Sequence, residues 1–250
     1  MTVTSEEELE GLRQIGRICA NVLEAMRNAL EPGITTAELD ALGRRLMEAE
    51  GARSAPELAY GFPGATCISV NEEIAHGIPG PRVIRAGDLV NIDVSAEKNG
   101  FFADTGASFA VPPVDPRIEK LVRDGKRAMW AGIGAVGADK PLRGIGNAVG
   151  LFAKKNGYSL VRNLASHGVG RSLHDAPEAI ATWPDRSERR VASNGLVLTV
   201  EPFLSLGADW AENGDDDEWT LYAEPMAPTV QYEHTIVATR SGPVVLTLPS

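Results

Sequence analysis

Apolar residues near the N-terminus recur every three or four positions, the spacing that places them on one face of a helix. The residues that follow this spacing are Leu9, Leu12, Ile15, Val22, Leu23 and Met26. They predict an amphipathic helix over 6–30, ended by Glu31-Pro32-Gly33. Thr35 is a suitable cap for a second helix, which we predict over 37–50 with Gly51 ending it.

The second half of the chain repeats this plan. Asp115-Pro116 opens a helix predicted over 117–134, and a break leads to a helix predicted over 142–156 that Gly157 ends. Each half therefore has two helices followed by strands, which favours an internal duplication. We expect one domain over 1–250, built from similar halves at about 6–112 and 113–250.

Strand signals follow each helix pair. The clearest is an apolar run over 89–95, a turn near Lys98-Asn99-Gly100 and a second run over 101–111, because Asn-Gly between two apolar runs is typical of a hairpin. Further strands are expected over 196–204 and 229–239, and an acidic loop over 205–226. The pattern predicts an α+β fold in which both halves share an antiparallel sheet, with helices on its outer face.

The predicted hairpin brings two carboxylates together. If Asn99-Gly100 forms the turn, Ser95 faces Asp104, and Asp93 lies diagonally to Asp104 on the same face, with Cβ atoms roughly 7 Å apart. Two buried carboxylates this close require a cation or a shared proton. The hairpin alone leaves another interpretation open, in which one aspartate is exposed and the other is bonded to backbone.

Three further residues carry ligand chemistry in apolar contexts. His167 lies among glycines, Glu201 ends an apolar run before Pro202, and Glu233 lies inside the run over 229–239. Taken alone, each is more readily interpreted as an ordinary core or surface residue. Together with the hairpin they supply four carboxylates and one imidazole, which suits Mn, Fe(II), Co or Zn. Two such ions balance four carboxylates, so the set favours a two-metal site over an acid–base pair.

Composition narrows the class of protein. The formal net charge is -10 and no Lys/Arg run stands out, which disfavours specific nucleic-acid binding. The two cysteines, Cys19 and Cys67, disfavour a disulfide framework, and a reducing cytoplasm is the expected location. The acidic N-terminus lacks the pattern of a signal peptide, and no apolar run is long enough to span a membrane.

Taken together, these motifs resemble those of the type I methionine aminopeptidases, which have the pita-bread fold. The resemblance extends from about Glu6 to Leu248. The motifs that carry it are Cys67-Ile68-Ser69-Val70-Asn71-Glu72, His76-Gly77-Ile78-Pro79, Val90-Asn91-Ile92-Asp93-Val94, Asp104-Thr105, His167-Gly168-Val169-Gly170, Leu173-His174-Asp175-Ala176-Pro177, Thr199-Val200-Glu201-Pro202 and Gln231-Tyr232-Glu233-His234-Thr235.

The resemblance implies a metal-dependent exopeptidase that releases the N-terminal methionine of nascent proteins. It implies two divalent ions (Co, Mn, Fe(II) or Zn) with the ligands Asp93, Asp104, His167, Glu201 and Glu233. It also gives catalytic roles to His76, His174 and Glu201. We expect His174, together with metal, to stabilise the oxyanion, Glu201 to move the proton of the attacking water to the leaving amine, and His76 to orient the peptide.

Methionine selection requires an apolar pocket, which the resemblance assigns to Phe62, Cys67, His174 and Trp219, with His76 also near the substrate. The chain departs from the usual bacterial pattern at four positions close to these motifs. Pro56 replaces a usual Cys, Ala59 a Tyr, Leu173 a Phe and Ser166 a Gly. The loss of two aromatic rings is expected to open or reshape the pocket.

Two other functions fit parts of the pattern. Xaa-Pro peptidases share the fold and the five ligands, but they usually carry a further N-terminal domain, and His76-Gly77-Ile78-Pro79 favours the methionine enzyme. A non-catalytic binding protein of the same fold would be expected to have lost ligands, and all five are present. The expected partners are N-terminal methionine and, transiently, the ribosome; we expect a monomer with no membrane partner.

Overall fold

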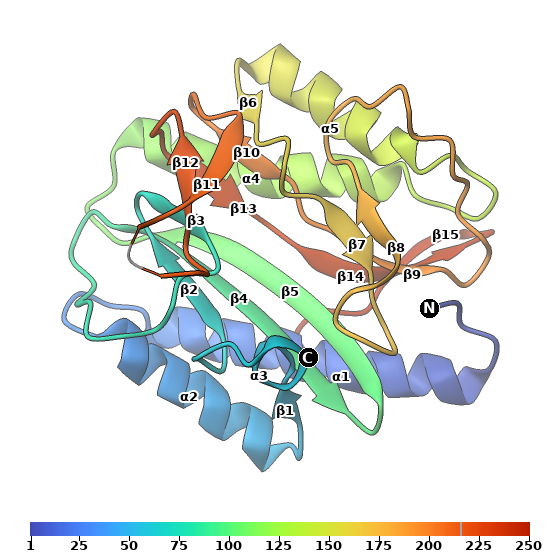
Figure 1. Ribbon diagram of the computed structural model, residues 1–250, viewed down its shortest axis with the longest axis horizontal. Helices are drawn as coiled ribbons and strands as arrows, with labels where there is room; N and C mark the ends of the chain where they lie inside the picture. The colour runs from blue at the N-terminus through green and yellow to red at the C-terminus, as the bar shows by residue number, and fades with distance from the viewer. Residues whose placement is uncertain (216) are drawn as a thin grey trace.

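The helices form the outside of the molecule and the strands lie between them. The computed structural model describes residues 1–215 and 217–250, with α1 (Glu6–Ala29) and α2 (Thr36–Ala49) on one side and α4 (Pro116–Gly134) and α5 (Arg143–Asn156) on the other (Figure 1). All four long helices were predicted to within one or two residues. Among the described helices, none is both long and apolar enough to cross a membrane.

The helix ends follow the capping residues in the sequence. Thr35 and Glu38 form a complete capping box at the start of α2, and the side chain of Asp115 accepts a hydrogen bond from the Arg117 N–H at the start of α4. After α2 and α5 the chain turns at Gly51 and Gly157, whose φ angles of 68° and 77° lie in the left-handed region. Both helix pairs therefore end at a glycine in the left-handed region, where the sequence predicted their ends.

The central hairpin joins β4 (Leu89–Lys98) to β5 (Phe101–Ala110) in the predicted register, with Lys98 opposite Phe101 and Ser95 opposite Asp104. Its turn residues Asn99 and Gly100 both have positive φ, as a two-residue hairpin turn requires. Along its other edge β4 pairs with β1 (Arg53–Ser54) and β2 (Cys67–Val70). This sheet places Asp93 and Asp104 in the middle of the molecule.

The second half contributes a five-stranded sheet in the order β15-β14-β9-β7-β8. Its strands are β7 (Ser166–Gly168), β8 (Asp175–Ile180), β9 (Val197–Val200), β14 (His234–Thr239) and β15 (Gly242–Val245). Two three-stranded sheets complete the fold, formed by β13 (Thr229–Gln231), β10 (Phe203–Ser205) and β6 (Ser159–Leu160), and by β11 (Trp210–Asn213), β12 (Leu221–Glu224) and β3 (Glu73–Ala75).

The two halves meet along β5. The Glu233 N–H donates to the Gly106 carbonyl at 2.8 Å, and the Thr235 hydroxyl donates to the Asp104 carbonyl at 2.8 Å. An isolated bridge pairs Ala107 with Tyr232. The strands of the second half thus continue the first sheet across the middle of the molecule, as the shared antiparallel arrangement predicts.

Three details of the strand prediction were wrong. The run over 196–204 divides into β9 and β10 at Glu201-Pro202, because proline has no N–H for a ladder. The run over 229–239 divides into β13 and β14, so Glu233 lies in the break between two strands. The segment 205–226 forms the β11–β12 hairpin and not only a loop; Asp216 lies outside the described residues.

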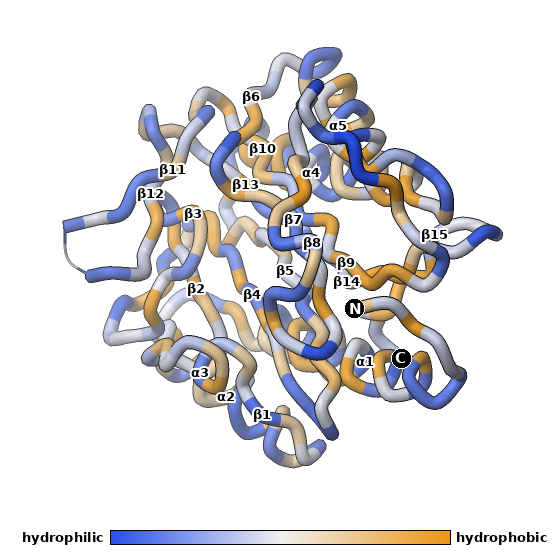
Figure 2. Tube along the Cα trace, turned by 45° about the vertical axis from the view of Figure 1, so that its right-hand side comes forward, coloured by the Kyte–Doolittle hydropathy of each residue, from blue (hydrophilic) through white to orange (hydrophobic). Residues whose placement is uncertain are grey.

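Each half has its own hydrophobic core. Ile15, Met26, Ile68 and Ile92 belong to the core between α1, α2 and the first sheet. The core of the second half packs α4 and α5 against the second sheet, through side chains such as Met129, Ile145, Leu198 and Ile236. Figure 2 shows the hydrophobic stretches along β9 and β14 and hydrophilic stretches in the outer loops. The polar side chains at the junction of the halves therefore lie between two apolar cores.

Candidate active site

The five predicted ligands converge where the halves meet, although they come from separate segments. Asp93 is on β4, Asp104 on β5 and His167 on β7, while Glu201 directly follows β9 and Glu233 lies between β13 and β14. Ligand atoms of Asp104, His167 and Glu233 all lie within 4.8 Å of one another. His167 Nε2 also lies 3.4 Å from Glu201 Oε1 and 4.0 Å from Asp104 Oδ2.

Neighbouring groups orient these side chains. The Thr199 hydroxyl donates to Glu201 Oε1 at 2.7 Å, and the Gln231 amide donates to Glu233 Oε2 at 3.0 Å. His167 Nδ1 lies 2.9 Å from the Gly168 carbonyl, which can only accept, so this nitrogen carries the hydrogen. Nε2 then carries no hydrogen, and its lone pair points toward carboxylate oxygens. This is the arrangement of a metal-ligating histidine.

The electrostatics of the cluster call for cations. Burial raises the pKa of Asp104 to about 6, and burial together with the Asp104 charge raises the pKa values of Asp93 and Glu233 well above their usual range. Burial also raises the pKa of Glu201 well above its usual range. Among the described residues, Asp104 Oδ1 and Glu233 Oε1 are buried oxygens without a hydrogen-bond partner. The donor set therefore fits divalent cations, which would satisfy both oxygens and stabilise the charges.

A cavity of about 300 Å³ opens beside this cluster. Four of the five predicted ligands line it, Glu233 being the exception, and so do all five residues assigned to substrate binding, namely Phe62, Cys67, His76, His174 and Trp219. The Phe62 and Trp219 rings meet edge to face with centroids 5.3 Å apart. Burial, and then the nearby carboxylates, raise the pKa of the Cys67 thiol, so this side chain is a neutral, apolar part of the wall.

The two histidines outside the ligand set reach the cavity in different ways. His76 follows β3 with φ 53°, a left-handed conformation that is uncommon for a residue with a side chain and often found at functional sites. His174 lies against His167, with ring centroids 4.0 Å apart. Burial lowers the pKa of both His76 and His174, so both are neutral near pH 7.

One cavity residue escaped the sequence analysis. Tyr60 lies at the end of a short helix, α3 (Ala55–Tyr60), and its hydroxyl is 2.6 Å from His174 Nδ1. The signal was present, because Ser54 followed by Pro56 and Glu57 is a helix start, and the Ser54 side chain does accept from the Glu57 N–H. Tyr60 supplies an aromatic ring next to Ala59, where the resemblance indicated that one was missing.

The comparisons with known proteins agree with this geometry. The model of metallopeptidase family M24 matches residues 10–240. Methionine aminopeptidase of Staphylococcus epidermidis is 46% identical over 99% of this chain and 98% of its own, and methionine aminopeptidase 2 of Bacillus subtilis is 44% identical over 99% of both chains. The crystal structure of methionine aminopeptidase from Rickettsia prowazekii superposes with a TM-score of 0.94 at 32% identity, covering 99% of this chain and 100% of that one.

The chain therefore belongs to metallopeptidase family M24, and the class of protein is a metal-dependent peptidase. Its identity to the relatives named above places it among the methionine aminopeptidases of that family. The prolidase from Pyrococcus horikoshii superposes with a TM-score of 0.78 at 20% identity, but this chain covers only 64% of it, and the likeness shows the fold alone. The expected pita-bread fold is confirmed.

Proposed function

We propose that this chain hydrolyses the first peptide bond of proteins and peptides that begin with methionine, using two divalent ions held by Asp93, Asp104, His167, Glu201 and Glu233. The observation that supports it best is the convergence of four carboxylates, two of them buried and two half-buried, and one neutral imidazole beside an apolar cavity. Asp104 and Glu233, which each have an unpartnered buried oxygen, would be shared by both ions. Asp93 would complete one site, and His167 with Glu201 the other.

The ions, when bound, would supply the positive charge that lowers the pKa of water and polarises the peptide carbonyl. Glu201 is our candidate to take the proton of the attacking water and give it to the leaving amine, since Thr199 holds one of its oxygens and the other remains available. His174 donates a hydrogen bond to the developing oxyanion. His76 orients the peptide near the scissile amide.

The methionine side chain would occupy the cavity between Phe62, Cys67 and Trp219. These groups offer two aromatic faces and a neutral thiol, which suit an unbranched thioether. His174 lies between this pocket and the ligand cluster, so the same residue can contact both the side chain and the scissile carbonyl. The free α-amine is then left near the carboxylates, which explains action at a chain end.

The cellular setting is also part of the proposal. The whole chain 1–250 acts as one catalytic domain, works as a monomer in the cytoplasm and contacts the ribosome transiently to reach nascent chains. Support comes from the family and from Cys19 and Cys67, which are both free thiols. The native metal would be Co, Mn, Fe(II) or Zn, because the ligands are hard oxygens and one imidazole.

The test is chelator-reversible release of methionine from a Met-Ala-Ser peptide, with Mn, Fe(II), Co and Zn compared. Xaa-Pro peptides are run in parallel, because the prolidase fold is shared. We expect release of methionine, loss with chelator and recovery with metal. Preferential cleavage of Xaa-Pro peptides would replace the proposed substrate, and metal binding without cleavage of any peptide would indicate a binding protein.

A further inference from the structure

Tyr60 makes a contact with the proposed oxyanion donor that the metal chemistry does not require. Its hydroxyl oxygen lies 2.6 Å from His174 Nδ1, and the two rings are tilted by 56° with centroids 5.6 Å apart. The Tyr60 residue is 49% exposed, so the hydroxyl does not need this histidine as a partner to avoid burial without a hydrogen bond. The contact is therefore better explained by an effect on the orientation of His174 than by the packing of Tyr60.

The direction of this hydrogen bond determines which nitrogen of His174 is free. A phenol keeps its proton near neutral pH and can either donate or accept. We take Tyr60 as the donor and Nδ1 of the neutral imidazole as the acceptor, a direction that the NMR measurement below tests. The hydrogen of the imidazole must then be on Nε2. Nε2 is also the nitrogen that remains for the cavity, where a donor is required to stabilise negative charge.

Among the described residues, Tyr60 is the one hydrogen-bond partner of the His174 ring. His174 lies in the segment between β7 and β8, where the Ser172 hydroxyl donates to the His174 carbonyl at 2.8 Å and so holds the backbone but not the ring. The contact with the His167 ring, tilted by 39°, restrains the plane of the His174 ring but allows it to turn by half a revolution. Such a turn would exchange the two nitrogens, and the Tyr60 hydroxyl opposes it.

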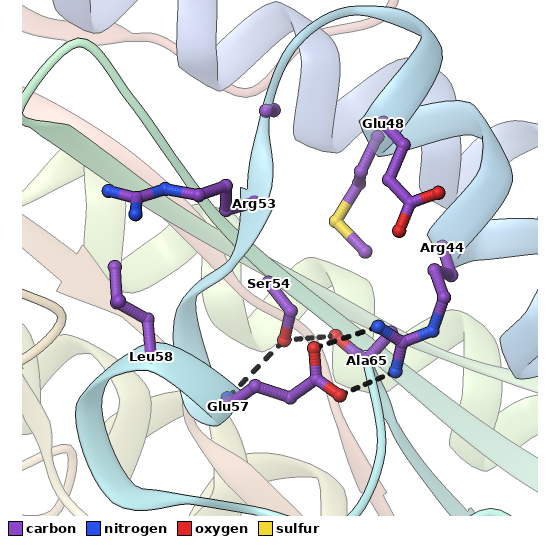
Figure 3. Close-up of a pocket in the computed structure, with 9 residues that line it drawn as sticks. Arg44, Glu48, Arg53, Ser54, Glu57, Leu58 and Ala65 are labelled. Carbon is purple, nitrogen blue, oxygen red and sulfur yellow. Dashed lines mark hydrogen bonds and ion pairs between the residues drawn. The ribbon is translucent and has the colours of Figure 1, made fainter.

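Tyr60 itself is held from the other end of α3. The Ser54 hydroxyl donates to the Ala65 carbonyl at 2.9 Å and caps α3 through the Glu57 N–H (Figure 3). Arg44 of α2 donates two hydrogen bonds to the Glu57 carboxylate, one of them at 2.9 Å, and both residues line a second cavity of about 310 Å³. These contacts anchor α3 to α2 and to the Ala65 segment, which fixes the position of Tyr60.

We infer that Tyr60 is a positioning residue that holds His174 with Nε2–H toward the substrate carbonyl and so contributes to turnover and not to methionine binding. The inference rests on the proposed function for the role of His174, although the Tyr60–His174 contact does not. Tyr60→Phe removes the hydroxyl and keeps the ring. We expect kcat to fall about three- to tenfold, the worth of one neutral hydrogen bond, with KM nearly unchanged.

Two comparisons separate positioning from a general structural effect. Tyr158→Phe is the matched control, since it removes a phenol that bonds Lys120 and Asp124 away from the cavity, and it should leave kcat and KM unchanged. In a His174→Ala background Tyr60→Phe should have no further effect, because the two residues act as one unit. An additive loss in the double variant would overturn the inference.

A direct readout comes from the nitrogen NMR shifts of the imidazoles in metal-free protein, where the chain's four histidines can be assigned by single substitutions. We expect His174 to be in the Nε2–H form in the wild type and in a mixture of forms in Tyr60→Phe. Identical shifts in both proteins would contradict the inference. If the wild type released no methionine, the proposed function would fail, while this spectrum would still decide the Tyr60–His174 contact.

Discussion

Replacement of Asp104 by Asn should change stability in opposite directions with and without metal. Burial raises the pKa of Asp104 from its ordinary 3.8 to about 6, and this difference corresponds to about 3 kcal/mol at pH 7. The charged carboxylate therefore destabilises the metal-free protein by that amount. Because Asn has the same shape and no charge, Asp104→Asn should stabilise metal-free protein at pH 7 by up to about 3 kcal/mol.

The pH dependence of the unfolding free energy tests the sign of this effect independently. Below about pH 3 Asp104 is largely protonated in both the folded and the unfolded chain, so the charge effect of the substitution nearly vanishes. Between about pH 4 and 6 the unfolded wild type ionises while the folded protein keeps its proton, so the advantage of the variant grows over this range and levels off above about pH 6. With metal present the order reverses, because loss of a ligand should weaken binding by at least about 100-fold.

The assay is urea unfolding of both proteins at pH 3, 5 and 7, with chelator and with Mn. Glu119→Gln is the matched control, because it removes one negative charge from an exposed position on α4. It should show neither the pH-dependent gain nor the loss of metal stabilisation. If Asp104→Asn destabilised the metal-free protein equally at every pH, the carboxylate would be an ordinary structural residue.

Three further substitutions test the strand packing beside His167, the methionine pocket and a buried carboxylate of α4. A Cβ at Gly168 would lie 2.4 Å from the Ala176 carbonyl oxygen, so Gly168→Ala should force β7 away from β8. The melting temperature should fall and turnover should be lost. Wild-type activity in this variant would show that the position of His167 does not depend on this packing. Trp219→Ala removes the ring that packs against Phe62. It should raise KM for methionine peptides about 10-fold or more, with a smaller change in kcat. An unchanged KM would exclude Trp219 from the methionine pocket. Burial acts to raise the pKa of Asp124, but hydrogen bonds from Lys120 and Tyr158 outweigh it, so the pKa is lowered on balance. Asp124→Asn should therefore lower the free energy of unfolding in urea by about 1–3 kcal/mol at pH 7, and by progressively less as the pH falls below 4. An equal loss at pH 3 would refute this interpretation.

The sequence predicted the elements that carry their own local signals. The four long helices have apolar stripes with caps or glycine stops, and the central hairpin has Asn99-Gly100, so its register followed from one turn. That register is enough to place Asp93 and Asp104 on one face, because side chains alternate along a strand. The ligand set followed in part from chemistry and in full from the family resemblance, because His167, Glu201 and Glu233 come from distant segments.

The rest depended on contacts between the halves, which no local pattern records. Glu233 leaves the strand because its N–H bonds the Gly106 carbonyl, and the β11–β12 hairpin forms because residues such as Ala211 and Ala223 pack with Ile74. Tyr60 was missed because α3 has only six residues, too few to show helical periodicity. Its capping signal was readable, but its partner His174 is 114 positions away.

The measurement that tests the metal site most directly is anomalous diffraction from crystals grown with Mn or Co. The account predicts two peaks beside the cavity, both contacted by Asp104 and Glu233, one also by Asp93 and the other by His167 and Glu201. Metal peaks found elsewhere, with the four carboxylates bonded only to one another and to water, would contradict the account.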